Sequence, residues 1–143
     1  MLIRGACHCG NIAFALAWEP DPVEIPVRAC DCAFCTAHGA NWTSKADGIL
    51  RIAIADRGLL STYAFATQTA DFHVCARCGV APLVTSRVDG SLFAVVNVNT
   101  FRNVDPALLR RASASFGGES EDARLARRKR NWIGDVAYVE TLL

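Results

Sequence analysis

The 143-residue chain lacks several features that would assign it to a common class of protein. No apolar stretch approaches the roughly 20 residues that cross a membrane, and Asn97 and Asn99 interrupt the longest candidate, 92–98. The N-terminus has no long apolar run, so we expect no signal peptide. The formal net charge is only +1, which argues against bulk nucleic-acid binding. We therefore expect a cytoplasmic protein that binds neither membranes nor nucleic acids.

The motifs of several large enzyme classes are also missing. The sequence shows no Ser-His-Asp set, no phosphate-binding glycine loop and no dinucleotide fingerprint. It has no internal repeat and no low-complexity segment. What remains is a hydrophobic content of 52% and a mean hydropathy of +0.21, enough for one folded domain, 1–143, with a core that needs no disulfides.

Seven cysteines in three short clusters are the most informative feature that is present. They are Cys7 and Cys9, then Cys30, Cys32 and Cys35, then Cys75 and Cys78. An odd number fits a disulfide framework badly, and a reducing cytoplasm favours metal binding. Four thiolates close a tetrahedral zinc site, whereas three leave a position for water or substrate. The counts thus indicate one structural and one catalytic zinc, over the alternatives of seven buried apolar cysteines or a redox dithiol.

Local geometry makes each cluster suited to a shared ion. Cys7 and Cys9 are two residues apart, so on an extended strand both side chains face the same side, and His8 between them faces away. Cys75-Ala76-Arg77-Cys78-Gly79 is typical of a zinc knuckle, because a glycine after the second cysteine tolerates a positive φ. Cys9-Gly10 repeats the Cys-Gly pair. Spacing alone does not determine which clusters share an ion.

Short apolar stretches separated by turn residues predict a mostly β domain. The expected strands are 12–18, 24–28, 50–55, 59–65, 72–75, 81–88 and 92–99. Asp56-Arg57-Gly58 predicts a hairpin between the third and fourth of these strands, and Asp89-Gly90 predicts another between the last two. A short helix is expected at 33–38.

The C-terminal part differs in character. Asp105-Pro106 predicts the start of a helix, and the small, polar segment 113–120 predicts a loop. A second helix is expected at 119–130, since an acidic start and a basic end both suit the helix dipole. Residues 132–133 and 136–139 are expected to dock this helix on the body.

The three cysteine motifs together resemble a known family. Gly5-Ala6-Cys7-His8-Cys9-Gly10, Cys30-Asp31-Cys32-Ala33-Phe34-Cys35 and Cys75-Ala76-Arg77-Cys78-Gly79 are similar to those of the glutathione-dependent formaldehyde-activating enzymes, a family that includes centromere protein V-like proteins. The similarity covers about 2–105, leaving 106–143 as a helical extension. It implies a mainly β, zinc-stapled fold of small sheets (β-tent-like) with a C-terminal helix here.

The resemblance also implies the ligand sets and the activity. A structural zinc would be held by Cys7, Cys9, Cys75 and Cys78, and a second, catalytic zinc by Cys30, Cys32 and Cys35. Because coordination deprotonates a thiol, a fourth ligand such as glutathione would attack formaldehyde and give S-hydroxymethylglutathione. We expect a carbon–sulfur lyase with zinc as cofactor and a small thiol as partner. The alternative is a zinc-binding interaction or chaperone module without chemistry.

Other residues leave two interpretations each. His38, the better placed of the two, or His73 would close the second site and make it structural. The basic run Arg127-Arg128-Lys129-Arg130, with Arg124, would bind an anion or nucleic acid, but a solvated helix end is favoured. Trp42 would line a pocket, with a core position favoured. Asn97 and Asn99 would hydrogen-bond a polar substrate or only loop backbone.

Overall fold

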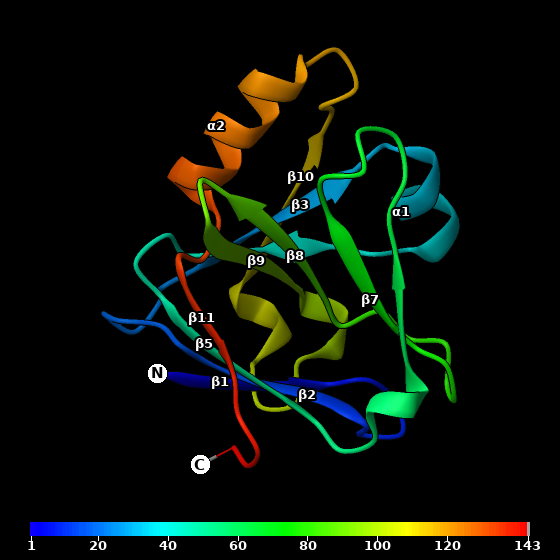
Figure 1. Cartoon of the computed structure of the whole chain (residues 1–143). Coiled ribbons are helices and arrows are strands. Elements are labelled where there is room, and N and C mark those ends of the chain that lie inside the picture. The colour runs from blue at the N-terminus through cyan, green and yellow to red at the C-terminus, as the bar shows by residue number, and fades with distance from the viewer. Residues whose placement is uncertain (143) are drawn as a thin grey trace.

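The structure is a computed structural model that describes residues 1–142. Within them the chain forms two β-sheets and two α-helices (Figure 1). The smaller sheet has the order β1 (Leu2–Ala6), β2 (Ile12–Ala17), β5 (Ile49–Ile54) and β11 (Asp135–Tyr138). The larger has the order β10 (Leu109–Ala114), β3 (Ile25–Cys30), β4 (Trp42–Thr43), β9 (Ser91–Asn97), β8 (Leu83–Val88), β7 (Asp71–Cys75) and β6 (Leu60–Tyr63).

The helices are α1 (Ala33–His38) and α2 (Glu121–Asn131). Figure 1 shows α2 above the larger sheet, at the opposite end of the molecule from β1 and β2. The predicted mainly β fold with a C-terminal helix is confirmed. Within the described residues, no helix combines the length and apolar character required to span a bilayer.

The larger sheet separates two clusters of buried side chains. Because side chains alternate along a strand, neighbouring residues of β9 enter different clusters: Ala94 and Val96 join one, and Phe93 and Val95 join the other. The first, which we call the main core, lies between the sheets and contains Cys7 and Cys75. The second, which we call the outer core, contains Cys35, Trp42, Phe72 and Trp132. The cysteine clusters therefore belong to different cores.

The two predicted hairpins have opposite outcomes. Asp89-Gly90 joins β8 and β9 with positive φ angles of 51° and 80°, as a tight hairpin turn requires. The hairpin expected across Asp56-Arg57-Gly58 is wrong, because β5 and β6 lie in different sheets. The segment Arg57–Leu59 forms a 3₁₀ turn, and the Asp56 carboxylate accepts a hydrogen bond from the Gly58 amide at 2.9 Å. This turn carries the chain from one sheet to the other.

The region after residue 100 departs from the predicted pattern twice. Asp105-Pro106 starts a single 3₁₀ turn, Pro106–Leu108, rather than an α-helix. The chain then continues as β10, which pairs in parallel with β3, so the loop expected at 113–120 begins only after Ala114. At the other end of the chain, strand β1 was also not predicted.

The last segment docks as expected. Ser120 caps α2 by accepting a hydrogen bond from the Ala123 amide at 3.1 Å. After the helix, Ile133 bridges to Ala94 of the larger sheet, and β11 pairs in parallel with β5. Helix α2 is thus held at its C-terminal end by both sheets.

Candidate metal centres and the adjoining cavity

The sulfurs of Cys7, Cys9, Cys75 and Cys78 converge at one point, within 4.8 Å of one another. The Cys7 and Cys9 sulfurs are 3.8 Å apart, and those of Cys9 and Cys75 are 3.5 Å apart. Four thiolates at a Zn–S distance of about 2.3 Å form a tetrahedron with edges of about 3.8 Å. The donor set and its spacing therefore fit zinc, and the structure brings together the four residues expected for the first site.

Two similar turns supply these sulfurs. Cys7 follows β1 and Cys75 ends β7, and each donates its amide to the carbonyl five residues later, that of Ile12 at 2.9 Å and of Val80 at 3.0 Å. In each turn a backbone amide also points at the first sulfur, from Ile12 to Cys7 at 3.3 Å and from Cys78 to Cys75 at 3.5 Å. Such donors stabilise thiolates. Cys7 and Cys9 thus lie in a turn, not on the strand that we expected.

Glycine completes both turns. Gly10 and Gly79 have φ angles of 86° and 81°, a region that residues with a Cβ rarely adopt. The Cys-Gly repeat noted in the sequence therefore marks two turns of the same kind. His8, between the first two cysteines, is exposed, in agreement with its expected surface position.

Burial and backbone hydrogen bonds affect these thiols in opposite directions. Burial raises the pKa of the Cys7 thiol to about 12. Burial also raises the pKa of Cys78, but hydrogen bonds from the backbone of Cys9 and Val80 outweigh it, and the pKa of this thiol falls to about 6. Cys7 and Cys75 are buried, and each sulfur accepts a backbone amide, an arrangement that is costly without a cation and supports a metal at this position.

The sulfurs of Cys30, Cys32 and Cys35 form the second cluster, again within 4.8 Å of one another. Cys30 ends β3, Cys32 caps α1 and Cys35 lies in its first turn. The Cys32 sulfur accepts a hydrogen bond from the Cys35 amide at 3.3 Å, and the Cys35 sulfur accepts one from the Trp42 indole N–H at 3.3 Å. These donors fit thiolates that ligate a metal.

Hydrogen bonding between Cys30 and Cys35 shifts the pKa values of their thiols in opposite directions. A hydrogen bond from Cys35 lowers the pKa of the Cys30 thiol to about 6. The same contact, followed by burial, raises the pKa of Cys35. The cluster is therefore prepared to bind a cation.

The histidines proposed as a fourth ligand lie elsewhere. Among residues 1–142, no histidine, carboxylate or further cysteine joins the three sulfurs in one group. The exposed His38 ring stacks on Phe34, with ring centroids 5.4 Å apart and an interplanar angle of 12°. His73 is buried between the Asp71 carbonyl, 3.0 Å from Nδ1, and the Tyr138 hydroxyl, 2.6 Å from Nε2. Neither closes the site in this structure.

A cavity of about 290 Å³ adjoins the three-cysteine cluster. Its wall is largely apolar and aromatic, with Trp42, Phe65, Phe72, Phe116 and Trp132. Trp42 is therefore both a core residue, as favoured, and a wall of this cavity. All three cysteines of the cluster line the cavity as well, so a ligand in the cavity can approach the cluster.

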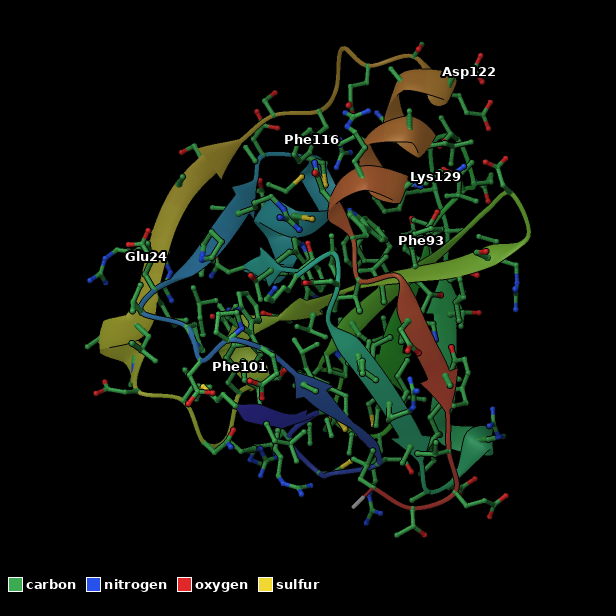
Figure 2. All side chains as sticks on the ribbon, turned by 90° about the vertical axis from the view of Figure 1, so that its left-hand side faces the viewer. Glu24, Phe93, Phe101, Phe116, Asp122 and Lys129 are labelled. Carbon is green, nitrogen blue, oxygen red and sulfur yellow. The ribbon has the colours of Figure 1, made fainter. Side chains whose placement is uncertain are left out.

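Four arginines line the same cavity: Arg28 from β3, and Arg124, Arg127 and Arg128 from α2. We expected the basic run to be a solvated helix end. This is wrong for Arg124, Arg127 and Arg128, which are buried or half-buried, and correct for Lys129 and Arg130, which are exposed. Figure 2 shows Phe116 beside α2, and the Arg127 guanidinium lies 3.7 Å from the centroid of its ring. The Arg128 guanidinium lies 5.0 Å from the Trp132 ring. In the sequence, Phe116 and Trp132 flank this basic helix, and this pattern could have indicated that the helix packs against a cavity.

Asn97 and Asn99 have backbone roles. The Asn97 amide donates to the Ala81 carbonyl at 3.1 Å, and its oxygen accepts from the amides of Asn41 and Asn99. Asn99 donates to the Gly39 carbonyl at 2.8 Å. Neither residue lines the cavity, so of the two interpretations the structure favours the one in which they stabilise loops.

Fold and site together define a small, mainly β protein with two cysteine clusters that can hold metal, one of them open to a cavity. The sequence model of the glutathione-dependent formaldehyde-activating enzymes matches residues 2–114, and the chain belongs to this family. The match ends before α2. The crystal structure of a Rhodobacter sphaeroides protein is similar, with 30% identity and a TM-score of 0.51 over 73% of this chain and 92% of that one. Among curated proteins, none matches the chain.

Proposed function

We propose that the protein is a zinc-dependent carbon–sulfur lyase that, in the direction of bond formation, adds a thiol such as glutathione to formaldehyde or a related aldehyde. One observation carries the proposal: three cysteine sulfurs, which no fourth protein ligand joins among residues 1–142, line a cavity of about 290 Å³. Family membership supports glutathione and formaldehyde as the substrate classes.

The residues take separate roles in this proposal. Cys7, Cys9, Cys75 and Cys78 hold a structural zinc, and Cys30, Cys32 and Cys35 hold a second one. Zinc at the second site would supply a free coordination position where an incoming thiol loses its proton. Trp42 and the Cys35 amide direct N–H groups at ligand sulfurs, which orients these ligands and reduces the negative charge on them.

The reaction balances without a further reactant. The thiol sulfur forms a bond to the aldehyde carbon, the π bond of the carbonyl breaks, and the proton that leaves the thiol ends on the former carbonyl oxygen. Trp42, Phe72 and Trp132 form walls that limit water around the reacting groups, and fewer waters strengthen electrostatic interactions there. The protein contributes mainly by holding the two reactants together.

The test is exchange between formaldehyde and glutathione, followed by NMR with zinc-loaded protein. We expect acceleration over the protein-free rate, and loss of that acceleration in Cys32→Ser. No acceleration by the zinc-loaded wild type would contradict the formaldehyde version of the proposal. A non-catalytic binding module would show no exchange and either one bound zinc or two closed metal sites.

A further inference from the structure

Arg128 of α2 is a buried cation whose hydrogen bonds are incomplete. Its side chain is 7% exposed and lines the cavity. Nη1 donates to the Thr69 carbonyl at 3.2 Å, the Thr69 hydroxyl at 2.8 Å and the Ser86 hydroxyl at 3.1 Å. Nε is buried and has no hydrogen-bond partner within residues 1–142. A buried N–H donor without a partner is uncommon in folded proteins and calls for an acceptor.

Arg28 presents a second guanidinium to the same cavity from β3. Its Nη2 donates to the Ser44 hydroxyl at 2.9 Å. In the described part of the chain, no carboxylate lies within ion-pair distance of either Arg28 or Arg128. Arg128 is thus buried and Arg28 half-buried, and the hydrogen bonds printed for both go to neutral groups.

The other two arginines of the cavity already have a counter-ion. Arg127 makes a bidentate contact with the Glu119 carboxylate, at 2.9 and 3.0 Å, and Arg124 lies 3.7 Å from it. Burial, and then repulsion from Arg127 and Arg124, lower the pKa of Arg128 to about 10. Arg128 therefore stays charged at neutral pH, and the carboxylate that acts on it, Glu119, already pairs with Arg127.

Charge balance in the cavity leaves a deficit of negative charge. Four guanidinium groups face one carboxylate and three cysteine sulfurs. Three thiolates with one zinc ion carry a single negative charge, so two positive charges remain unmatched. An unmatched buried charge destabilises the fold, and an anion bound in the cavity removes this penalty.

We propose that Arg128 and Arg28 form an anion subsite of the cavity, which binds a carboxylate carried by the thiol substrate. A guanidinium binds a carboxylate through paired N–H donors, and the side chains of both Arg128 and Arg28 line the cavity. The assignment rests on the proposed function for the thiol end of the ligand. Arg28 comes from β3, within the residues that match the family model, and Arg128 comes from α2, beyond them.

The experiment compares two small thiols that differ in one charge, 3-mercaptopropionate and its methyl ester. Their affinities for zinc-loaded, full-length protein are measured by calorimetry. The wild type is expected to prefer the acid by about tenfold or more, as for a hydrogen-bonded charge pair. In Arg128→Met this preference falls to about twofold or less. Arg130→Met removes the same charge from an exposed position of α2 and keeps the preference.

Two further measurements separate the subsite from the proposed chemistry. 3-(Methylthio)propionate carries the carboxylate but no thiol proton, and it is expected to raise the melting temperature of the wild type and not of Arg128→Met. This shift together with no formaldehyde exchange would support the subsite and contradict the proposed function. Equal affinity of the wild type for acid and ester, with exchange intact, would overturn the subsite alone.

A structural role for Arg128 makes a different prediction. If Arg128 served only to join Thr69 and Ser86, Arg128→Met would lower stability and leave the acid-to-ester ratio unchanged, which would overturn the proposal. Arg128→Lys keeps the charge and is expected to recover part of the preference. If Arg128→Met does not fold, Arg28→Met decides in its place: a smaller preference for the acid supports the subsite, and an unchanged one overturns it.

Discussion

The two cysteine clusters use the same ligand atom but join very different parts of the chain. The four-cysteine cluster connects two turns separated by 66 residues between Cys9 and Cys75, and two of its members lie in the main core. The three-cysteine cluster comes from one short segment, Cys30 to Cys35, and borders the outer core and the cavity. A cross-link between distant segments restricts the unfolded chain strongly, whereas a local one restricts it little. The first cluster is thus suited to stability and the second to chemistry.

The largest expected effect is that of breaking the distant cross-link. Cys75→Ser removes a buried sulfur from the four-cysteine cluster, and the structural zinc that we propose there would contribute on the order of 10 kcal/mol to folding, about the whole stability of a domain. We expect loss of the cooperative melting transition by circular dichroism. His8→Ala, at an exposed position between two ligands, should melt like the wild type. A well-folded Cys75→Ser protein would contradict the structural role.

Cys32→Ser is expected to remove one metal ion and leave the fold intact. Cys32 caps α1 through its sulfur, and serine is a preferred N-cap, so the helix keeps its cap. Elemental analysis should show one zinc per chain in place of two, with a melting temperature within a few degrees of the wild type. Loss of the fold would make the second site structural and remove the difference between the clusters.

A smaller effect is expected from Trp42→Phe. This change removes the indole N–H that donates to the Cys35 sulfur while it keeps an aromatic ring in the wall. Loss of such a supporting hydrogen bond lowers metal affinity by about 10- to 100-fold, which competition with a chelator measures. Trp132→Phe, at a residue that lines the same cavity but stacks on Arg128, should bind zinc like the wild type. Equal affinities in the two variants would argue against this role of Trp42.

The comparison also separates what local sequence predicts from what it does not. The segment 33–38 forms a helix with the predicted bounds, and the Cys-Gly pairs form turns with positive φ, because both depend on neighbouring residues. The pairing of Cys7 and Cys9 with Cys75 and Cys78 came from the family resemblance, since spacing does not encode a contact across 66 residues. The hairpin expected between β5 and β6 was wrong for the same reason: alternation identifies strands but not their partners.

Helix α2 is the clearest case in which local sequence does not predict the surroundings of a side chain. Its acidic start and basic end suit the helix dipole, and this local argument favours solvent for its arginines. Docking of the helix over β8 and the outer core instead turns Arg128 inward. That position depends on how Trp132 and Ile133 anchor the following segment, which is a tertiary effect.

The smallest expected effect concerns His38, and it decides whether the second site is open. His38 is exposed and stacks on Phe34, so His38→Ala should change stability by no more than about 0.5 kcal/mol. If three sulfurs alone hold the metal, the variant keeps both ions, and cobalt substituted at the second site gives the same absorption spectrum as in the wild type. Glutathione should then change both spectra alike, because it enters the same free position. A nitrogen ligand lost in the variant would shift the cobalt bands before any thiol is added, and the two clusters would then both be closed sites.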